Sequence, residues 1–250
     1  MADKIDYELI GDDMQAVIIT LDKGETVTAE AGAMMLMDDT IEMETSTNGG
    51  LLKGLKRLVT GETFFVTSFS CVGKKGTVGF SAPYPGKIIP LDLKKTGPML
   101  CQRDAYLCSA SGIEISIAFT KRLGAGFFGG EGFILQRLEG GGLAFVDAGG
   151  TILQKDLKPD EILRVDTGCL VCFEETVDYS IEYVGNVKTA LFGGEGLFYA
   201  CLNGPGRVYL QTLPFSRLAD RVNHAMGRSS GEHRRGSAIS DALGNIVSGD

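Results

Sequence analysis

Apolar and polar residues alternate along several stretches of the chain, and this alternation predicts half-buried β-strands. In the segment 113–119, isoleucine or phenylalanine occupies every second position. Side chains two residues apart on a strand lie on the same face of a sheet. The pattern therefore predicts strands that bury one face and expose the other.

Three strand-like segments begin with the same dipeptide. Their openings are Gly61-Glu62, Gly130-Glu131 and Gly194-Glu195, about 69 and 64 residues apart. They continue as TFFVTSFS, GFILQRLE and GLFYACLN, and each reaches a glycine-rich turn before a second apolar run. Repetition at this interval predicts an internally repeated architecture. Each pair of runs also predicts a β-hairpin.

A glycine upstream of each hairpin predicts a bend that a Cβ atom would obstruct, at Gly32, Gly112 and Gly168. A unit of this length buries too little apolar surface to fold alone, so the copies are expected to share a core about a pseudo-threefold axis. The predicted fold is all-β, with repeats at approximately 5–92, 93–150 and 151–213 inside a single domain, 1–226.

Two segments depart from the strand pattern. Residues 51–59 place leucine and valine on one arc of a helical wheel and basic residues on the other, which predicts a short amphipathic helix. Pro214 opens a second helix near 214–226 whose apolar residues have helical spacing and are expected to dock on the core. The polar tail 227–250 is predicted to be disordered.

Composition narrows the function classes for this chain of 250 residues. A formal net charge of -8 disfavours nucleic-acid binding. Six cysteines and a start without a secretory or presequence-like pattern favour a reducing, cytoplasmic location. No uncharged apolar stretch approaches the roughly 18 residues that a membrane-spanning helix needs.

The sequence offers no clear catalytic constellation, so we expect a protein that is not an enzyme and has no cofactor. Its two histidines, His224 and His233, lie in the C-terminal segment, outside the repeats. Cys169 and Cys172 have the C-x-x-C spacing, but they fall in a strand-like segment rather than in the turn that a redox or zinc pair requires. The cysteines are interpreted as core or surface thiols.

The glutamates of the repeated dipeptide are the sharpest binding candidates, namely Glu62, Glu131 and Glu195. Copies of one carboxylate related by a threefold axis could converge and bind a cation or a small ligand. The alternative, which we favour, is that each accepts backbone N–H hydrogen bonds at the turn into its hairpin. No catalytic or metal residue is assigned.

The basic side of the predicted helix at 51–59 offers a second candidate surface, formed by Lys53, Lys56 and Arg57. A short amphipathic helix of this kind can lie on anionic lipid. The alternative is that it packs against the protein's own sheet, and the acidic net charge favours this packing.

The segments GGLLKGLKRLVTGETFFVTSF, GAGFFGGEGFILQRLEGGGLAFVDAG and LFGGEGLFYACLNGPGRVYLQTLP resemble the family of the altered-inheritance-of-mitochondria protein twenty-four. The resemblance covers approximately residues 5–215. It implies a fold like that of the tryptophan RNA-binding attenuation protein, with three short double-stranded β-helix units per chain. None of the attenuation protein's ligand-binding residues can be matched to positions here, so its tryptophan and RNA sites are not carried over.

The resemblance also implies that mitochondrial members support inner-membrane organisation without a known enzymatic activity. The start of this chain favours a bacterial cytosolic relative. The leading hypothesis is a non-enzymatic scaffold or interaction protein that binds protein partners or self-associates through exposed strand edges. The alternatives are a module that senses a small ligand or metal ion, and a factor that associates peripherally with membranes.

Overall fold

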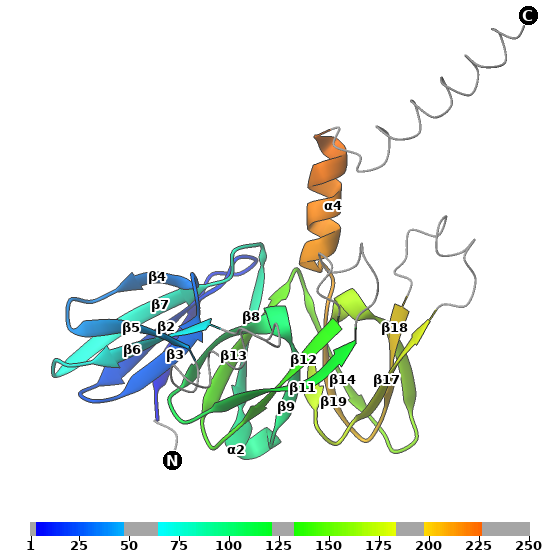
Figure 1. The fold of residues 1–250 in the computed structure, drawn as a ribbon, viewed down its shortest axis with the longest axis horizontal. Helices are drawn as coiled ribbons and strands as arrows, with labels where there is room; N and C mark the ends of the chain where they lie inside the picture. The colour runs from blue at the N-terminus through cyan, green and yellow to red at the C-terminus, as the bar shows by residue number, and fades with distance from the viewer. Residues whose placement is uncertain (1–3, 48–64, 122–132, 184–197, 227–250) are drawn as a thin grey trace, which may run out of the picture. The chain divides into compact units, whose positions relative to one another are not determined.

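The computed structural model describes residues 4–47, 65–121, 133–183 and 198–226, and most of these residues are in β-strands (Figure 1). The chain divides into two compact units, Met1–Pro214 and Phe215–Asp250. All strands of the described residues lie in the first unit, which confirms the all-β prediction. A pseudo-threefold arrangement stays a prediction.

The first strand, β1 (Asp6–Ile10), is followed by three sets of six strands. The first set is β2 (Ala16–Asp22), β3 (Thr26–Glu30), β4 (Met34–Met37), β5 (Ile41–Thr47), β6 (Phe65–Cys71) and β7 (Lys75–Ser81). The second set is β8 (Gly86–Asp92), β9 (Met99–Gln102), β10 (Tyr106–Ala110), β11 (Glu114–Lys121), β12 (Phe133–Glu139) and β13 (Leu143–Gly149). The third set is β14 (Ile152–Leu157), β15 (Ile162–Asp166), β16 (Leu170–Glu174), β17 (Asp178–Tyr183), β18 (Phe198–Asn203) and β19 (Gly206–Gln211).

The same antiparallel pairing scheme occurs in each set. The sixth strand lies between the first and third strands, so β7 pairs with β2 and β4. The fifth strand lies between the second and fourth, so β6 pairs with β3 and β5. β8 pairs with β13, which places the start of the second set at Gly86. Each set therefore contributes to two different sheets.

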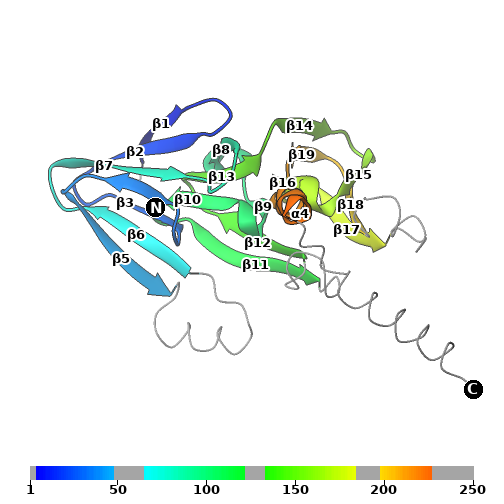
Figure 2. The same cartoon turned by 90° about the horizontal axis from the view of Figure 1, so that it is seen from above.

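Two strand pairs join the sets. In the first joint, β10 pairs with β3, and in the second joint, β16 pairs with β9. Each joint thus pairs the second strand of one set with the third strand of the next. The resulting sheets have the orders β1-β2-β7-β4, β5-β6-β3-β10-β13-β8, β11-β12-β9-β16-β19-β14 and β15-β18-β17 (Figure 2).

The two sheets of a set enclose its apolar core. Phe69 on β6 and Phe80 on β7 show this arrangement, because their rings meet edge to face with centroids 5.2 Å apart. Both side chains are almost completely buried. Burial of apolar side chains is the dominant favourable term in folding, and an aromatic pair adds a smaller contribution.

The predicted hairpins are wrong, although the strands themselves are confirmed. β6 and β7 follow one another in sequence but hydrogen-bond to strands of different sheets. The same is true of β12 with β13 and of β18 with β19. The glycine-rich turn between two such strands is a corner that carries the chain from one sheet to the facing one.

The glycine bends predicted at equivalent places are only partly equivalent. Gly32 lies between β3 and β4, and Gly168 lies in the short 3-10 helix η3 (Thr167–Cys169) between β15 and β16. Gly112 instead lies between β10 and β11, at a different corner. Gly32 and Gly112 have φ angles of 91° and 87°, which glycine adopts without strain.

The helical segments of the described chain are few and short. α2 (Leu93–Thr96) follows β8, and η1 (Arg103–Ala105) connects β9 to β10. The predicted C-terminal helix is present as α4 (Phe215–Ala225), but it contains no buried residue. The expectation that its apolar side chains dock on the core concerns a contact between the two units and stays a prediction.

Two further predictions concern regions that the structure does not describe. The amphipathic helix at 51–59 and the disordered tail at 227–250 lie outside the described residues. Within the described residues, no helix is both long enough and apolar enough to cross a bilayer.

Candidate functional site

The residues predicted to form binding sites all lie outside the described parts of the chain. This applies to the three repeated glutamates, Glu62, Glu131 and Glu195, and to the basic residues Lys53, Lys56 and Arg57. The ligand-binding and membrane-binding hypotheses that depend on them stay predictions. Two other features of the described residues are candidates for function, a buried acidic pair at the first joint and two open strand edges.

The cysteines are free thiols, and four of them, Cys71, Cys101, Cys108 and Cys172, are buried. This agrees with their interpretation as core thiols. Cys172 lies opposite Cys101 across the second joint rather than pairing with Cys169. Burial raises the pKa of the Cys108 and Cys172 thiols well above its ordinary value, so neither thiol is suited to act as a nucleophile at neutral pH.

Polar side chains cross the first joint. The hydroxyl of Tyr106 on β10 donates to the carbonyl oxygen of Thr28 on β3, at 3.1 Å, and lies 3.0 Å from the Ser109 hydroxyl. The hydroxyl oxygens of Thr28 and Ser109 lie 3.2 Å apart. Tyr106 is fully buried, and burial raises its pKa. These bonds fix the pairing of β3 with β10 because a buried hydroxyl without a partner is costly.

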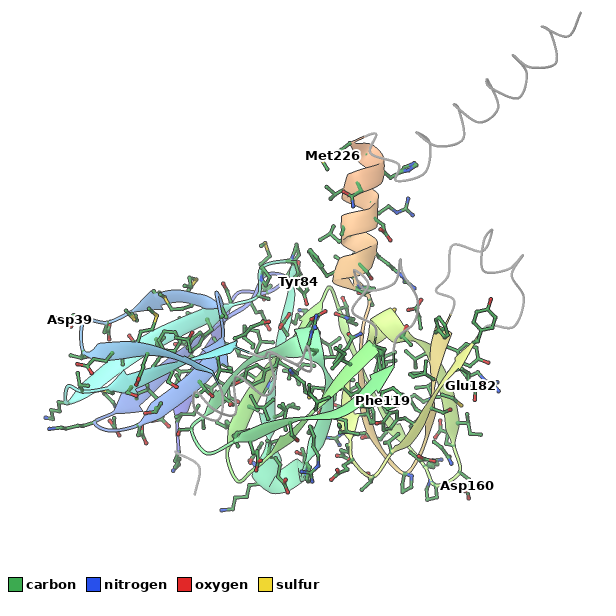
Figure 3. All side chains as sticks on the ribbon, viewed as in Figure 1. Asp39, Tyr84, Phe119, Asp160, Glu182 and Met226 are labelled. Atoms are coloured by element: carbon green, nitrogen blue, oxygen red, sulfur yellow. The ribbon has the colours of Figure 1, made fainter. Side chains whose placement is uncertain are left out.

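Asp147 on β13 is the first member of the acidic pair. Its side chain is 4% exposed, and its Oδ2 atom has no hydrogen-bond partner among the described residues. Tyr84, in the loop between β7 and β8 (Figure 3), donates its hydroxyl to the carboxylate. Burial raises the pKa of Asp147 to about 6, although the Tyr84 hydrogen bond opposes the shift.

Glu30, the last residue of β3, is the second member of the pair. Burial raises its pKa to about 7, and the negative charges of Asp147 and Asp104 add to the shift. Arg103 lowers it only in part, and its guanidinium is 3.1 Å from the carboxylate of neighbouring Asp104. Two carboxyl groups that share a partly buried site therefore retain protons into the neutral pH range.

The second joint holds neutral side chains at the equivalent places. Gln102 occupies at the second joint the place that Glu30 occupies at the first. Glu30 comes directly after Ala29, which lies opposite Cys108. Gln102 comes directly after Cys101, which lies opposite Cys172. Gln211 likewise occupies on β19 the place of Asp147 on β13.

Backbone groups satisfy both glutamines. The Gln211 amide donates to the Gly168 carbonyl at 2.8 Å and accepts from the Gly149 amide at 2.7 Å. The amide of Gln102 donates to the Thr167 carbonyl at 3.3 Å. Acidic residues are thus not required by the geometry of a joint, and the first joint carries a pair of proton-binding groups that the second lacks.

The chemistry available to this pair is proton binding. Within the described ranges, no group of three histidine, cysteine, aspartate or glutamate side chains is placed to hold a metal ion. A pair of carboxyl groups that is protonated at low pH and charged at high pH makes the stability of the joint depend on pH.

The two open strand edges are those of β4 and β15. Among the described residues, β4 pairs only with β7, and β15 pairs only with β18. The other third strands, β10 and β16, each pair across a joint as well as within their set. The other second strands, β3 and β9, do the same. The third strand β4 and the second strand β15 are therefore the two that have no described partner across a joint.

β4 has the composition of a covered strand, but its side chains are exposed. Its sequence is MMLM, and Met35, Leu36 and Met37 are 50%, 43% and 40% exposed. Every residue of the equivalent strand β10 is buried, as are four of the five residues of β16. An apolar strand edge of this kind is a template for pairing with another chain.

The other edge strands of the described sheets carry charges that oppose such pairing. Examples from each are Asp6 (β1), Glu42 (β5), Lys87 (β8), Glu114 (β11), Lys155 (β14), Arg164 (β15) and Glu182 (β17). Among the edge strands that the structure describes, only β4 lacks a charged residue.

Sequence reasoning missed both features. Asp147 stands in the apolar segment LAFVDAG, and a lone carboxylate in a strand of that kind is a signal that can be read directly. The MMLM run of β4 is also visible, but nothing in the sequence shows that its outer edge lacks a partner.

The chain is similar to known proteins along most of its length. The model of the family described as mitochondrial biogenesis AIM24 matches residues 7–213. Among solved structures, the crystal structure of protein SPYM3_0169 from Streptococcus pyogenes is similar, with a TM-score of 0.75 and 21% identity. That match covers 89% of this chain and 100% of the other, and it concerns the fold alone. Comparison with curated proteins gives no match.

Proposed function

The chain belongs to the mitochondrial biogenesis AIM24 family, and from this premise we propose that it is a non-enzymatic scaffold protein that associates with further copies of itself. The observation that carries the proposal is the open, uncharged edge of β4. A sheet edge that exposes consecutive large apolar side chains favours association, because burial of that surface is stabilising.

The proposal includes three successive repeats of one strand set, each like a unit of the tryptophan RNA-binding attenuation protein. It does not include a closed pseudo-threefold ring within one chain, because such a ring would pair β15 with β4 of the same chain and leave neither edge for a second copy. Support comes from the pairing scheme that the sets share. It also comes from the constant interval of 64 residues between matching positions of the second and third sets, as between Cys108 and Cys172 or Phe145 and Tyr209. Sets with the same internal pairing can be joined repeatedly through the same pair of edges.

Light scattering combined with native mass spectrometry tests the proposed association. We expect a mass that is a multiple of the 26.6 kDa chain at micromolar concentration. Burial of one apolar edge is a modest interaction, so the assembly is expected to dissociate on dilution. A mass of 26.6 kDa at every concentration, with no protein retained in pull-downs, would count against a scaffold.

A further inference from the structure

We propose that β15 of one copy pairs antiparallel with β4 of a second copy, in the register that both joints inside the chain use. The inference rests on the proposed function, because it names the surface and the occupant through which copies associate. The occupant is a second copy of this chain, and its charged edge strand covers the uncharged one.

The pairing scheme makes the two open edges complementary. Each joint pairs the second strand of one set with the third strand of the next, as β3 with β10 and β9 with β16. Three sets linked by two joints leave one third strand, β4, and one second strand, β15, without that pairing. A third joint between two copies would use the same kinds of strand as the two joints within a copy.

The irregular pairing of the third strands fixes the register on β4. The pairing of β4 with β7 shifts between Met34 and Leu36. The equivalent shifts lie between Tyr106 and Cys108 and between Leu170 and Cys172. Leu36 therefore occupies the place of Cys108 and Cys172. These cysteines lie opposite Ala29 and Cys101 across the joints.

The fifth strands fix the register on β15. Ala29, Cys101 and Val165 lie opposite Thr67, Gln136 and Ala200. Thr67, Gln136 and Ala200 match one another, because each lies two residues before a buried residue that recurs in the repeat. These buried residues are Phe69, Leu138 and Leu202. Val165 therefore occupies the place of Ala29 and Cys101. The predicted pairs across the copies are Leu36 with Val165 and Met37 with Arg164.

The side chains suit this register. Met37 corresponds to Ser109, whose hydroxyl lies 3.2 Å from that of Thr28 across the first joint. Side chains at these places are thus in contact when a joint is formed. Arg164 is exposed, and its guanidinium lies 5.7 Å from the centre of the Tyr199 ring on its own chain. The aliphatic part of an arginine can cover an apolar neighbour such as Met37.

The two edges lie on different strands, so the contact is heterologous. A chain that offers β4 to one neighbour offers β15 to another, and such contacts give closed rings or open filaments. A closed ring would leave neither β4 nor β15 unpaired. We expect a ring of this kind, because the remaining edge strands carry charges that oppose further pairing.

Cysteine cross-linking of the full-length chain tests the register. Met37→Cys protein is mixed with Arg164→Cys protein, both carrying Cys201→Ser because Cys201 lies opposite residue 164 on β18. The mixture is oxidised with copper-phenanthroline, and the joined peptides are identified by mass spectrometry. We expect a disulfide between positions 37 and 164 in the mixture and not in either variant alone, because opposite residues have Cα atoms within disulfide range. Ile162→Cys is the matched control, since residue 162 is 60% exposed and lies two places along β15.

The outcomes separate this inference from the proposed function. A 37–164 cross-link at least about tenfold more abundant than the 37–162 cross-link supports the register. If the wild-type protein is multimeric but the 37–162 product dominates or neither product forms, this pairing is wrong while the scaffold proposal stands. If the wild-type protein is a single chain at every concentration, both fall.

Discussion

A lysine at position 37 is expected to convert the assembled protein into single chains. Met37 is 40% exposed on β4, and the predicted register places it opposite Arg164 of the neighbouring copy. Met37→Lys would bring two positive charges together at a strand pair and bury an unpaired amine. We expect a penalty of about 3 kcal/mol, which corresponds to a roughly 100-fold weaker association, measured as the dissociation constant by light scattering on a dilution series.

Two further variants show whether the effect is specific. Met43→Lys is the matched control, because Met43 is 51% exposed on β5, an edge strand that already carries Glu42 and Glu44. It is expected to leave the assembly intact. Arg164→Glu combined with Met37→Lys replaces the repulsion by an ion pair and is expected to restore association. Dissociation by Met43→Lys to the same extent, or no rescue by the double variant, would contradict the proposed interface.

Glutamine at position 30 is expected to stabilise the protein at pH 8 but not at pH 4.5. The raised pKa of Glu30, about 7, means that the folded state binds its proton more tightly than the unfolded state. This contribution to stability is fully present below the ordinary pKa of 4.5 and is lost as the pH rises through 7. A shift of this size corresponds to roughly 3 kcal/mol, and partial solvent access reduces it to about 2 kcal/mol.

The measurement is the free energy of unfolding by urea at several pH values and a fixed protein concentration. Glu30→Gln should exceed the wild type by about 2 kcal/mol at pH 8, and the difference should disappear towards pH 4.5. The substitution imitates the second joint, where Gln102 occupies the same place. Glu42→Gln, at an exposed position on β5, is the control and should change little. A gain of equal size at both pH values would exclude proton binding by Glu30 as its cause.

The strands were predictable from the sequence, but the way they pair was not. Alternation in the segment 113–119 predicts a strand with one buried face, and the strand is present as β11 (Glu114–Lys121). The burial is uneven along β11, because Ile115 is buried while Ile117 is 38% exposed. The alternation also does not report which strand lies beside another. Phe69 and Phe80 were read as parts of one hairpin, whereas they face each other from two sheets. Short-range patterns cannot distinguish a tight hairpin from a corner between sheets, because both need a glycine-rich turn.

The candidate site was hidden for a related reason. The raised pKa of Glu30 depends on burial and on Asp147, a residue of another strand set, so it cannot be read from the sequence around Glu30. The open edge of β4 is likewise defined by the absence of a neighbour among the described strands. The glutamates that the repeat made conspicuous, Glu62, Glu131 and Glu195, lie outside the described residues, so their role stays a prediction.

Hydrogen–deuterium exchange tests most directly whether the open edges are paired between copies. Amide exchange is compared between the wild-type assembly and the Met37→Lys variant. The proposed pairing predicts slower exchange in the wild type for β4 (Met34–Met37) and β15 (Ile162–Asp166), and equal exchange for the edge strand β14 (Ile152–Leu157). Equal exchange of β4 and β15 in a multimeric wild type and a monomeric variant would contradict it.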